Sequence, residues 1–354
     1  MKYLVTGGAG FIGSALCLAL MAQPGTHLTV VDMLTYAANP ASLAPLAGKP
    51  GYRFVQADIG DGAAMRALML DVGPDAVFHL AAETHVDRSI DSAGAFIQTN
   101  LVGTFQMLEA ARAYWSGLSP QAAAKFRFVH ISTDEVFGSL GAEGSFSEST
   151  AYDPSSPYSA SKAGADHLAR AWHRTYGLPV IVSNCSNNYG PRQFPEKLIP
   201  LTLLNALGGA PINVYGKGDN VRDWLFVDDH AQALMTLARA APPGETYMIG
   251  GRAERTNLDV VKTICALLDA RFPAQAPHDR LIRFVSDRPG HDFRYSVDCS
   301  KIERDFGWTQ AVTFEAGMAK TVDWYLANED WWKPLRSRVY DGGRLGLAST
   351  GAAS

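Results

Sequence analysis

Short hydrophobic runs rich in β-branched residues alternate with longer segments of helical spacing along the first half of the chain. The short runs predict strands at residues 3–5, 28–31, 52–55, 76–80, 126–131 and 180–182. The longer segments between them predict helices at residues 11–23, 62–71, 96–115 and 159–176. Because short apolar strands alternate here with helices, the pattern is typical of an α/β fold with a doubly wound parallel sheet covered on both faces.

The pattern changes after Asn187, where Pro and Gly interrupt the chain and helices are predicted at residues 198–207, 227–240 and 258–271. We expect residues 1–186 to form the large domain, with a return of the chain to it near residues 223–250. Residues 187–222 and 251–337 are expected to form a smaller C-terminal α+β lobe that binds the substrate. Residues 338–354, which end in Gly, Ala and Ser, are predicted to be a flexible tail.

The composition points to small-molecule partners. The 354 residues carry a net charge of −4 and no long run of Lys or Arg, which argues against binding to nucleic acid or to a membrane surface. No apolar stretch reaches the roughly 18 residues that a spanning helix needs, and the N-terminus lacks the pattern of a signal peptide. The four cysteines form no C-x-x-C pair, and no cluster has the spacing of a metal site. We expect a cytoplasmic protein without a bound metal.

A glycine motif lies directly between the first predicted strand and the first predicted helix. Gly7, Gly10 and Gly13 permit a tight turn, close approach of a pyrophosphate and close packing of helix on strand. Asp32 ends the second predicted strand 19 positions beyond Gly13, where a carboxylate would accept hydrogen bonds from an adenosine ribose and repel a 2′-phosphate. The motif therefore predicts a Rossmann-type domain that binds NAD rather than NADP.

Two adjacent acids and a Tyr-x-x-x-Lys pair are the strongest candidates for catalysis. Asp134 and Glu135 follow Thr133 at the end of a predicted strand, and Tyr158 and Lys162 share one face of a predicted helix. Neighbours in an extended chain point to opposite sides, so the two acids can serve one substrate only if the chain bends there. Repulsion in a shared pocket would raise the pKa of one carboxyl, as a general acid requires. The lysine ammonium, together with a positive nicotinamide ring, would favour the tyrosine phenolate.

The glycine spacing and the Tyr-x-x-x-Lys pair resemble the extended short-chain dehydrogenase/reductase family. Within that family the paired acids, and the segments at 81–90, 184–191, 194–200, 222–224 and 287–292, are similar to the group of 4,6-dehydratases that act on dTDP-glucose. Arg192 departs from the resemblance, because an aromatic residue or histidine is more usual there. Members of the family pair through two helices, here residues 96–115 and 159–176, so the resemblance also implies a homodimer.

The resemblance implies contacts with both ligands. The expected NAD contacts are Gly7, Gly10, Phe11, Ile12, Gly13, Asp32, Leu34, Thr35, Asp58, Ile59, Leu80, Ala81, Ala82, Thr99, Ser132, Tyr158 and Lys162. The expected contacts with the nucleotide sugar are Thr84, His85, Asp87, Asn187, Asn188, Glu196, Lys197, Leu198, Tyr215, Arg222, Asn257, Arg288, His291 and Tyr295. Arginines would bind the diphosphate, and Tyr215 would stack on the base. Asp58 and His85 could equally well be loop caps.

The chemistry that the resemblance implies is a dehydration with no net redox change. Tyr158 takes the proton of the C4 hydroxyl while the C4 hydride passes to NAD, and Thr133 hydrogen-bonds the same oxygen. Glu135 then removes the C5 proton, and protonated Asp134 donates to the departing C6 hydroxyl. Hydride returns to C6, and Glu135 returns a proton to C5.

Two alternatives remain open. The sequence indicates the residues that would recognise the nucleotide base less clearly than any other part of the site. The enzyme could therefore act on UDP- or another NDP-hexose, as a 4,6-dehydratase or a 4-epimerase. The chain could also be a dinucleotide-sensing regulator without turnover. A sensor would not need Tyr158, Lys162, Asp134 and Glu135 all together.

Overall fold

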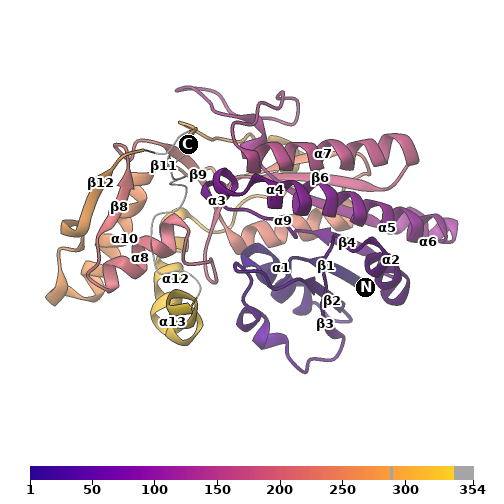
Figure 1. The fold of residues 1–354 in the computed structure, drawn as a ribbon, viewed down its shortest axis with the longest axis horizontal. Helices are drawn as coiled ribbons and strands as arrows, with labels where there is room; N and C mark the ends of the chain where they lie inside the picture. Colours follow the sequence, from indigo (N-terminus) through magenta and orange to yellow (C-terminus); the bar gives the residue numbers. More distant parts are fainter. Residues whose placement is uncertain (288–289, 339–354) are drawn as a thin grey trace, which may run out of the picture.

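A seven-stranded parallel sheet forms the centre of the larger part of the molecule (Figure 1). The computed structural model describes residues 1–287 and 290–338. The strand order is β10-β6-β5-β4-β1-β2-β3. The strands are β1 (Lys2–Thr6), β2 (His27–Asp32), β3 (Tyr52–Gln56), β4 (Ala76–His79), β5 (Arg127–Thr133), β6 (Val180–Cys185) and β10 (Thr246–Ile249). The order reverses between β1 and β4, which confirms the predicted Rossmann-type fold.

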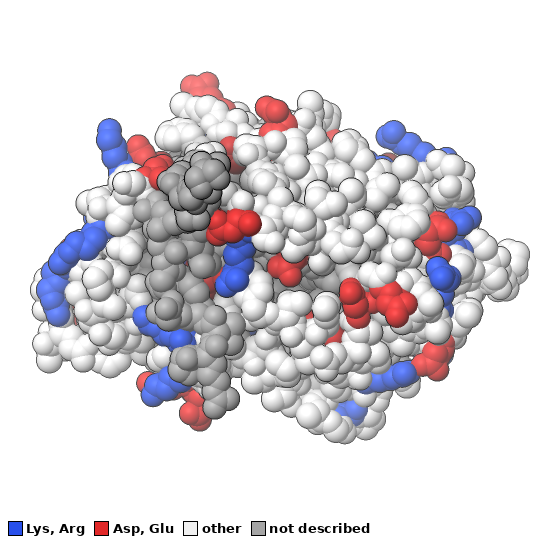
Figure 2. Space-filling model, viewed as in Figure 1, with Lys and Arg blue, Asp and Glu red and all other residues white. Residues whose placement is uncertain are grey.

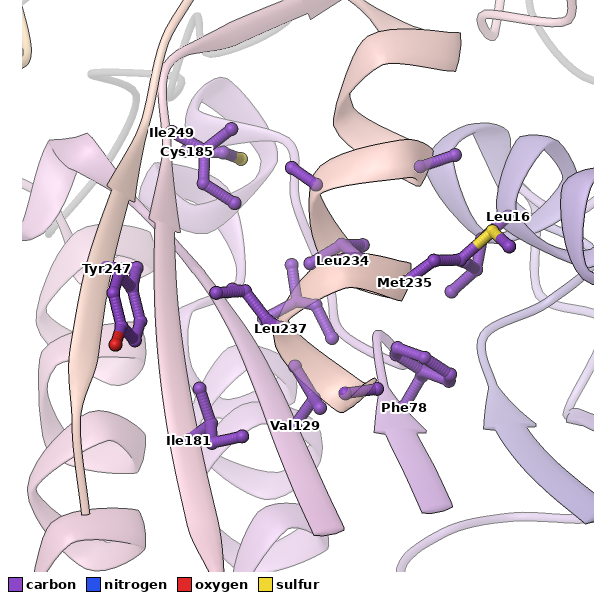
Figure 3. Close-up of a cluster of buried hydrophobic side chains, with 14 of the residues drawn as sticks. Leu16, Phe78, Val129, Ile181, Cys185, Leu234, Met235, Leu237, Tyr247 and Ile249 are labelled. Carbon is purple, nitrogen blue, oxygen red and sulfur yellow. The ribbon is translucent and has the colours of Figure 1, made fainter. Parts of the chain in front are cut away.

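Helices cover both faces of this sheet. One face carries α1 (Phe11–Met21) and α9 (Val227–Ala240); the other carries α2 (Gly62–Val72), α5 (Thr104–Ser116) and α7 (Pro157–Tyr176). Neighbouring strand residues point to opposite faces, so Phe78 packs in the α1–α9 core and Val77 in the α2–α5 core. Figure 3 shows Leu16 of α1 and Leu234 of α9 packed over the sheet. Burial on both faces explains why the central strands β1 and β4 are mostly apolar.

The predicted helix at residues 96–115 differs in the structure. It is divided into α4 (Ala93–Phe96), a π-helical segment η2 (Ile97–Gly103) and α5. Two short helices, α3 (Val86–Asp91) and α6 (Pro120–Lys125), flank it and were not predicted. π-helical turns inside α-helices occur often at functional sites, and η2 borders the cavity described below.

A smaller lobe with its own apolar core lies beside the large sheet, on the left in Figure 1. It contains the three-stranded sheet β11-β9-β7 and the two-stranded sheet β12-β8. The strands are β7 (Asn187–Tyr189), β8 (Ile212–Tyr215), β9 (Val221–Phe226), β11 (Glu254–Thr256) and β12 (Ile282–Val285). The helices that pack in this lobe are α8 (Leu198–Leu207), α10 (Asn257–Arg271), α12 (Phe314–Ala327) and α13 (Glu329–Arg338).

The chain returns to the large sheet through α9 and β10, whereas β9 pairs with β7 in the smaller sheet. Helix α11 (Ser300–Phe306) then packs on β10. The domain boundaries at residues 187, 223 and 251 stay a prediction. Of the predicted tail at 338–354, only residue 338 is described, as the end of α13; residues 339–354 lie outside the described part of the chain.

Charges of both signs are interspersed over the face of the molecule that Figure 2 shows. Among residues 1–287 and 290–338, no helix is long and apolar enough to cross a membrane. The same residues contain no group of three His, Cys, Asp or Glu side chains placed to hold a metal ion.

Candidate active site

A cavity of about 530 Å³ opens at the carboxyl ends of the central strands. Ligands bind at this edge in open α/β sheets, because the strand order reverses there. All five predicted catalytic residues line the cavity: Thr133, Asp134, Glu135, Tyr158 and Lys162. The predicted cofactor contacts that also line it are Gly7, Gly10, Phe11, Ile12, Gly13, Asp32, Thr35, Asp58, Ile59, Leu80, Ala81, Ala82, Thr99 and Ser132.

The glycine turn after β1 has no room for side chains. Gly7 has a φ of 71°, and a Cβ there would lie 2.6 Å from the backbone nitrogen of Ala81. A Cβ on Gly13 would lie 2.2 Å from the carbonyl oxygen of Gly7. Gly10 begins α1 without a side-chain cap. The turn thus presents bare backbone and a helix N-terminus to the cavity, which fits the pyrophosphate of a dinucleotide.

Asp32 holds this turn from the end of β2. One carboxylate oxygen accepts a hydrogen bond from the Ala9 N–H at 2.9 Å, and the other accepts one from the Leu34 N–H at 2.8 Å. Burial raises the pKa of Asp32, and the two backbone hydrogen bonds oppose that shift. Leu34, a predicted NAD contact, does not line the cavity; its backbone, with a φ of 61°, is fixed by Asp32 instead.

The two adjacent acids lie on the bend that the sequence predicts. Strand β5 ends at Thr133, and residues Asp134–Phe137 form a single 3₁₀ turn. The Thr133 hydroxyl accepts a hydrogen bond from the Glu135 N–H at 3.2 Å and so caps the turn. Gly138 ends the turn with a φ of 83°, where a Cβ would lie 2.5 Å from the Asp153 carbonyl oxygen. The turn brings both carboxyl groups to one cavity.

The two acids differ in burial. Asp134 is only 1% exposed, whereas Glu135 is partly exposed. Burial, then repulsion from Glu135 and Asp223, raises the pKa of Asp134 well above its usual value, although Arg222 opposes the shift. No group among the described residues hydrogen-bonds Asp134 Oδ2. Asp134 is therefore the acid of the pair whose protonated form the folded protein favours.

The raised pKa of Asp134 predicts a stability gain for Asp134→Asn. The folded protein takes up a proton at Asp134 that the unfolded chain releases above about pH 4. The resulting cost of folding is absent in acid and grows as the pH rises toward the raised pKa, whereas asparagine stays neutral throughout. Thermal unfolding of both proteins across this range should show a Tm advantage of the variant that grows from acid to neutral pH. An advantage that shrinks with rising pH would contradict the assignment.

Tyr158 and Lys162 are buried in the first turns of α7. Their exposed fractions are 7% and 5%, and Lys162 Nζ donates a hydrogen bond to the Ile131 carbonyl oxygen at 2.7 Å. Burial lowers the pKa of Lys162, and Asp166 opposes that shift. Burial and the nearby Glu135 raise the pKa of Tyr158 well above its usual value. The chain's own groups thus favour the protonated form of Tyr158. The expected phenolate therefore depends on the positive charge that NAD would bring.

Asn100 is a buried residue behind the cavity wall that the sequence interpretation missed. Its side chain lies in η2, is fully buried and exchanges two hydrogen bonds with the Glu83 backbone, at 2.8 Å and 3.0 Å. Its amide also donates to the Ser161 hydroxyl at 2.9 Å. Asn100 therefore ties the loop after β4 to α7, beside Tyr158. The π-helical turn that orients it has no signal in the helical spacing.

Only some of the predicted substrate contacts line the cavity. Thr84, Asn187, Asn188, Glu196 and Lys197 line the cavity. The contacts that do not line it are His85, Asp87, Leu198, Tyr215, Arg222, Asn257, His291 and Tyr295. Arg288 lies outside the described residues.

His85 and Asp58, which the sequence left as either ligand contacts or loop caps, both form caps. His85 Nδ1 accepts a hydrogen bond from the Arg88 N–H at 3.4 Å at the start of α3, and its ring lies outside the cavity lining. Asp58 Oδ1 accepts one from the Gly60 N–H at 2.7 Å, but Asp58 also lines the cavity. Capping and a ligand contact are therefore compatible at Asp58.

Arg222 and Tyr295 extend the site toward the smaller lobe. The Arg222 guanidinium lies 4.2 Å above the Tyr295 ring and donates to the carbonyl oxygens of Val221 and Asp292, at 2.7 Å and 2.9 Å. Burial raises the pKa of Tyr295, and Glu135 adds to this shift. The positive charge of Arg222 also acts on Asp134. Arg222 therefore interacts electrostatically with Asp134, and Tyr295 with Glu135. Both acids belong to the turn Asp134–Phe137, called the acid turn below.

Comparison with known proteins identifies the family. Residues 4–321 match the model of the GDP-mannose 4,6 dehydratase family. A probable dTDP-glucose 4,6-dehydratase of Sinorhizobium fredii is 58% identical over 98% of this chain and 99% of its own. A dTDP-glucose 4,6-dehydratase of Neisseria meningitidis is 57% identical over 98% of this chain and 99% of its own. The structure of a Streptomyces venezuelae dTDP-glucose 4,6-dehydratase with NAD bound is 46% identical, with a TM-score of 0.86 over 95% of this chain and all of that one. This chain belongs to the GDP-mannose 4,6 dehydratase family.

Proposed function

We propose that this protein is an NAD-dependent dTDP-glucose 4,6-dehydratase, which converts dTDP-glucose to dTDP-4-keto-6-deoxyglucose and water. The observation that carries the proposal is the turn Asp134–Phe137, which brings a buried carboxyl group of raised pKa and a more exposed carboxyl group to the cavity that Tyr158 also lines. Elimination of water needs an acid and a base at neighbouring carbons. The names of the two relatives, at 57% and 58% identity, support this reaction and this substrate.

Each catalytic residue has a separate role in the proposed reaction. NAD, when bound, would accept the C4 hydride and return it to C6. Tyr158 takes the proton of the C4 hydroxyl, whose oxygen Thr133 hydrogen-bonds, and buried Lys162 supplies positive charge near it. The new 4-ketone acidifies C5, so Glu135 removes the C5 proton while Asp134 gives its proton to the C6 hydroxyl, which leaves as water. Glu135 then returns a proton to C5, and the net redox change is zero. Tyr158 releases the C4 proton and Asp134 regains one, so the enzyme returns to its starting state.

The glycine turn and Asp32 are proposed to hold the dinucleotide throughout the cycle. Bare backbone at Gly7 and Gly13 supports pyrophosphate binding, and the Asp32 carboxylate, as in the sequence interpretation, supports NAD over NADP. Because hydride leaves and returns within one turnover, the cofactor need not dissociate.

Product analysis tests the proposal. We expect dTDP-glucose to give a product lighter by one water with a 4-keto group, and UDP-glucose to react far more slowly. Faster conversion of UDP-glucose would assign a different nucleotide. A product of unchanged mass with inverted C4 would identify a 4-epimerase, and no product at all would favour a dinucleotide sensor.

A homodimer through η2, α5 and α7 is part of the proposal. Ile97, Phe105 and Tyr176 expose between 38% and 45% of their surface on these segments, and Phe105 stacks edge-on against Trp172 of α7. Apolar side chains on adjacent helices support a face that a second copy would cover.

Phe105→Asp is therefore expected to convert the dimer to a monomer, because a charge would be buried at the apolar interface. Analytical ultracentrifugation measures the change. Phe284→Asp is the matched control, since Phe284 is 60% exposed on β12 of the smaller lobe. A Phe105→Asp protein with the oligomeric state of the parent would refute this interface.

The place of the reaction follows from its product. A 4-keto-6-deoxy sugar nucleotide is a precursor of deoxysugars such as rhamnose, so we propose a role in dTDP-rhamnose or a related synthesis. A cytoplasmic location is supported by the four cysteines, which are all free and buried.

A further inference from the structure

Gln193 lines the cavity but has no part in the chemistry above. It follows β7 in a loop that also carries Phe194, Glu196 and Lys197 into the cavity wall. Gln193 is only 8% exposed, and its backbone carbonyl accepts a hydrogen bond from the Tyr325 hydroxyl. The residue is thus fixed at its backbone and buried at its side chain.

The orientation of the Gln193 amide is determined by its neighbour. Its Nε2 lies 3.0 Å from the Asn188 carbonyl oxygen, which can only accept a hydrogen bond. The nitrogen must therefore face Asn188, and Oε1 must face away. No group among the described residues hydrogen-bonds Oε1, although the atom is buried. Buried polar atoms are nearly always hydrogen-bonded in proteins. We therefore expect a bound ligand to donate a hydrogen bond to Gln193 Oε1.

The chemistry of the proposed substrate limits which donor this is. In the proposed reaction, the C4 hydroxyl faces Tyr158 and Thr133, the C6 hydroxyl faces Asp134, and the C1 oxygen carries the diphosphate. Within the hexose, the hydroxyls at C2 and C3 are the donors that remain, and the diphosphate separates them from the donors of the nucleoside. Gln193 lies in the wall formed by residues 187–197, whereas the glycine turn proposed to hold the dinucleotide lies at β1 and β2.

We propose that Gln193 Oε1 accepts a hydrogen bond from the C2 or C3 hydroxyl of the bound hexose and so selects sugars that carry this donor. This inference rests on the proposed function. It makes Gln193 a specificity-determining residue, which acts on the choice of sugar rather than on proton or hydride transfer.

The test measures kcat/KM for dTDP-glucose and for its 2-deoxy and 3-deoxy analogues. A buried acceptor left unpaired costs enough free energy that we expect one analogue to lose about 10- to 100-fold with the parent protein. In Gln193→Leu and Gln193→Met, which lack the acceptor, removal of the same hydroxyl should have less than about a threefold effect. Two variants are used because either one alone could disturb the loop.

Arg192→Asn is the matched control. Arg192 neighbours Gln193 but lies outside the cavity lining and packs 5.3 Å from the Trp324 ring; asparagine tolerates its φ of 68°. This variant should keep the full loss for the deoxy analogue.

Two results would overturn the inference: equal kcat/KM for all three sugars with the parent protein, or the same loss in the Gln193 variants as in the parent. Loss of bound NAD from the Gln193 variants, with NAD retained in Arg192→Asn, would assign Oε1 to the cofactor and also overturn it. Failure of the parent to convert dTDP-glucose itself would instead refute the proposed function.

Discussion

Glu135→Gln is expected to stop the reaction after the first hydride transfer, so that reduced cofactor accumulates on the enzyme. Glutamine keeps the shape of the side chain but cannot take the C5 proton, whereas Tyr158 can still take the C4 hydroxyl proton while bound NAD would accept the C4 hydride. Loss of a general base typically costs about 10²- to 10⁴-fold in rate, and we expect kcat to fall within this range. Stopped-flow absorbance of NADH after mixing with dTDP-glucose measures the accumulation.

Glu143→Gln provides the control for this variant. Glu143 is an exposed glutamate in the loop that follows the acid turn, outside the cavity lining. Its replacement should leave turnover and the NADH signal at parental values. A Glu135→Gln enzyme that turned over normally would show that another group removes the C5 proton.

Tyr158→Phe is expected to block the oxidation at C4, the step that precedes removal of the C5 proton. Phenylalanine fills the same buried position but has no hydroxyl to receive the C4 proton, so neither product nor NADH should form. We expect kcat to fall by about 10²- to 10⁴-fold, as for loss of a general base. The same stopped-flow experiment distinguishes the two variants, because reduced cofactor appears with Glu135→Gln and stays absent with Tyr158→Phe.

Tyr176→Phe is the matched substitution in the same helix. Tyr176 is 45% exposed at the end of α7, far along the helix from Tyr158, and its change should leave turnover intact. Rapid NADH formation by Tyr158→Phe would contradict the role given to the phenol.

The sequence predicted those parts of the site whose constraints are local. The glycine turn follows from backbone positions that exclude a Cβ, and the turn at Asp134 follows from an acid pair that only a bent chain can use. The parallel sheet follows from strands that are apolar on both faces. Each of these features leaves a pattern in residues close together in the chain, although the contact that excludes a Cβ at Gly7 comes from distant Ala81.

The parts that were missed depend on contacts between distant segments. Asn100 acts through a π-helical turn and reaches Glu83 and Ser161, which are 17 and 61 positions away. Asp32 was assigned to the ribose, but its hydrogen bonds to Ala9 and Leu34 also organise the turn itself. Gln193 differs, because Asn188 is only five positions away, but the loop conformation that brings both to the cavity wall has no signal in the sequence.

The pKa of Tyr158 shows the same limit of sequence reasoning. The spacing of Tyr158 and Lys162 indicates attraction between phenolate and ammonium. It does not reveal that the phenol is 93% buried or that Glu135 faces it from the acid turn, and both raise the pKa of Tyr158. Proximity to one cation is therefore too little to predict the state of the phenol.

The most direct test of the account follows the hydride itself. The purified protein, with no cofactor added, is given an equal mixture of unlabelled dTDP-glucose and dTDP-glucose that carries deuterium at C4 and ¹³C in the hexose. We predict that deuterium appears at C6 only in ¹³C-labelled product, because NAD stays bound while each hydride returns to the sugar it left. Deuterium in product without ¹³C, or its loss to solvent, would contradict a dehydration coupled to hydride return within one turnover.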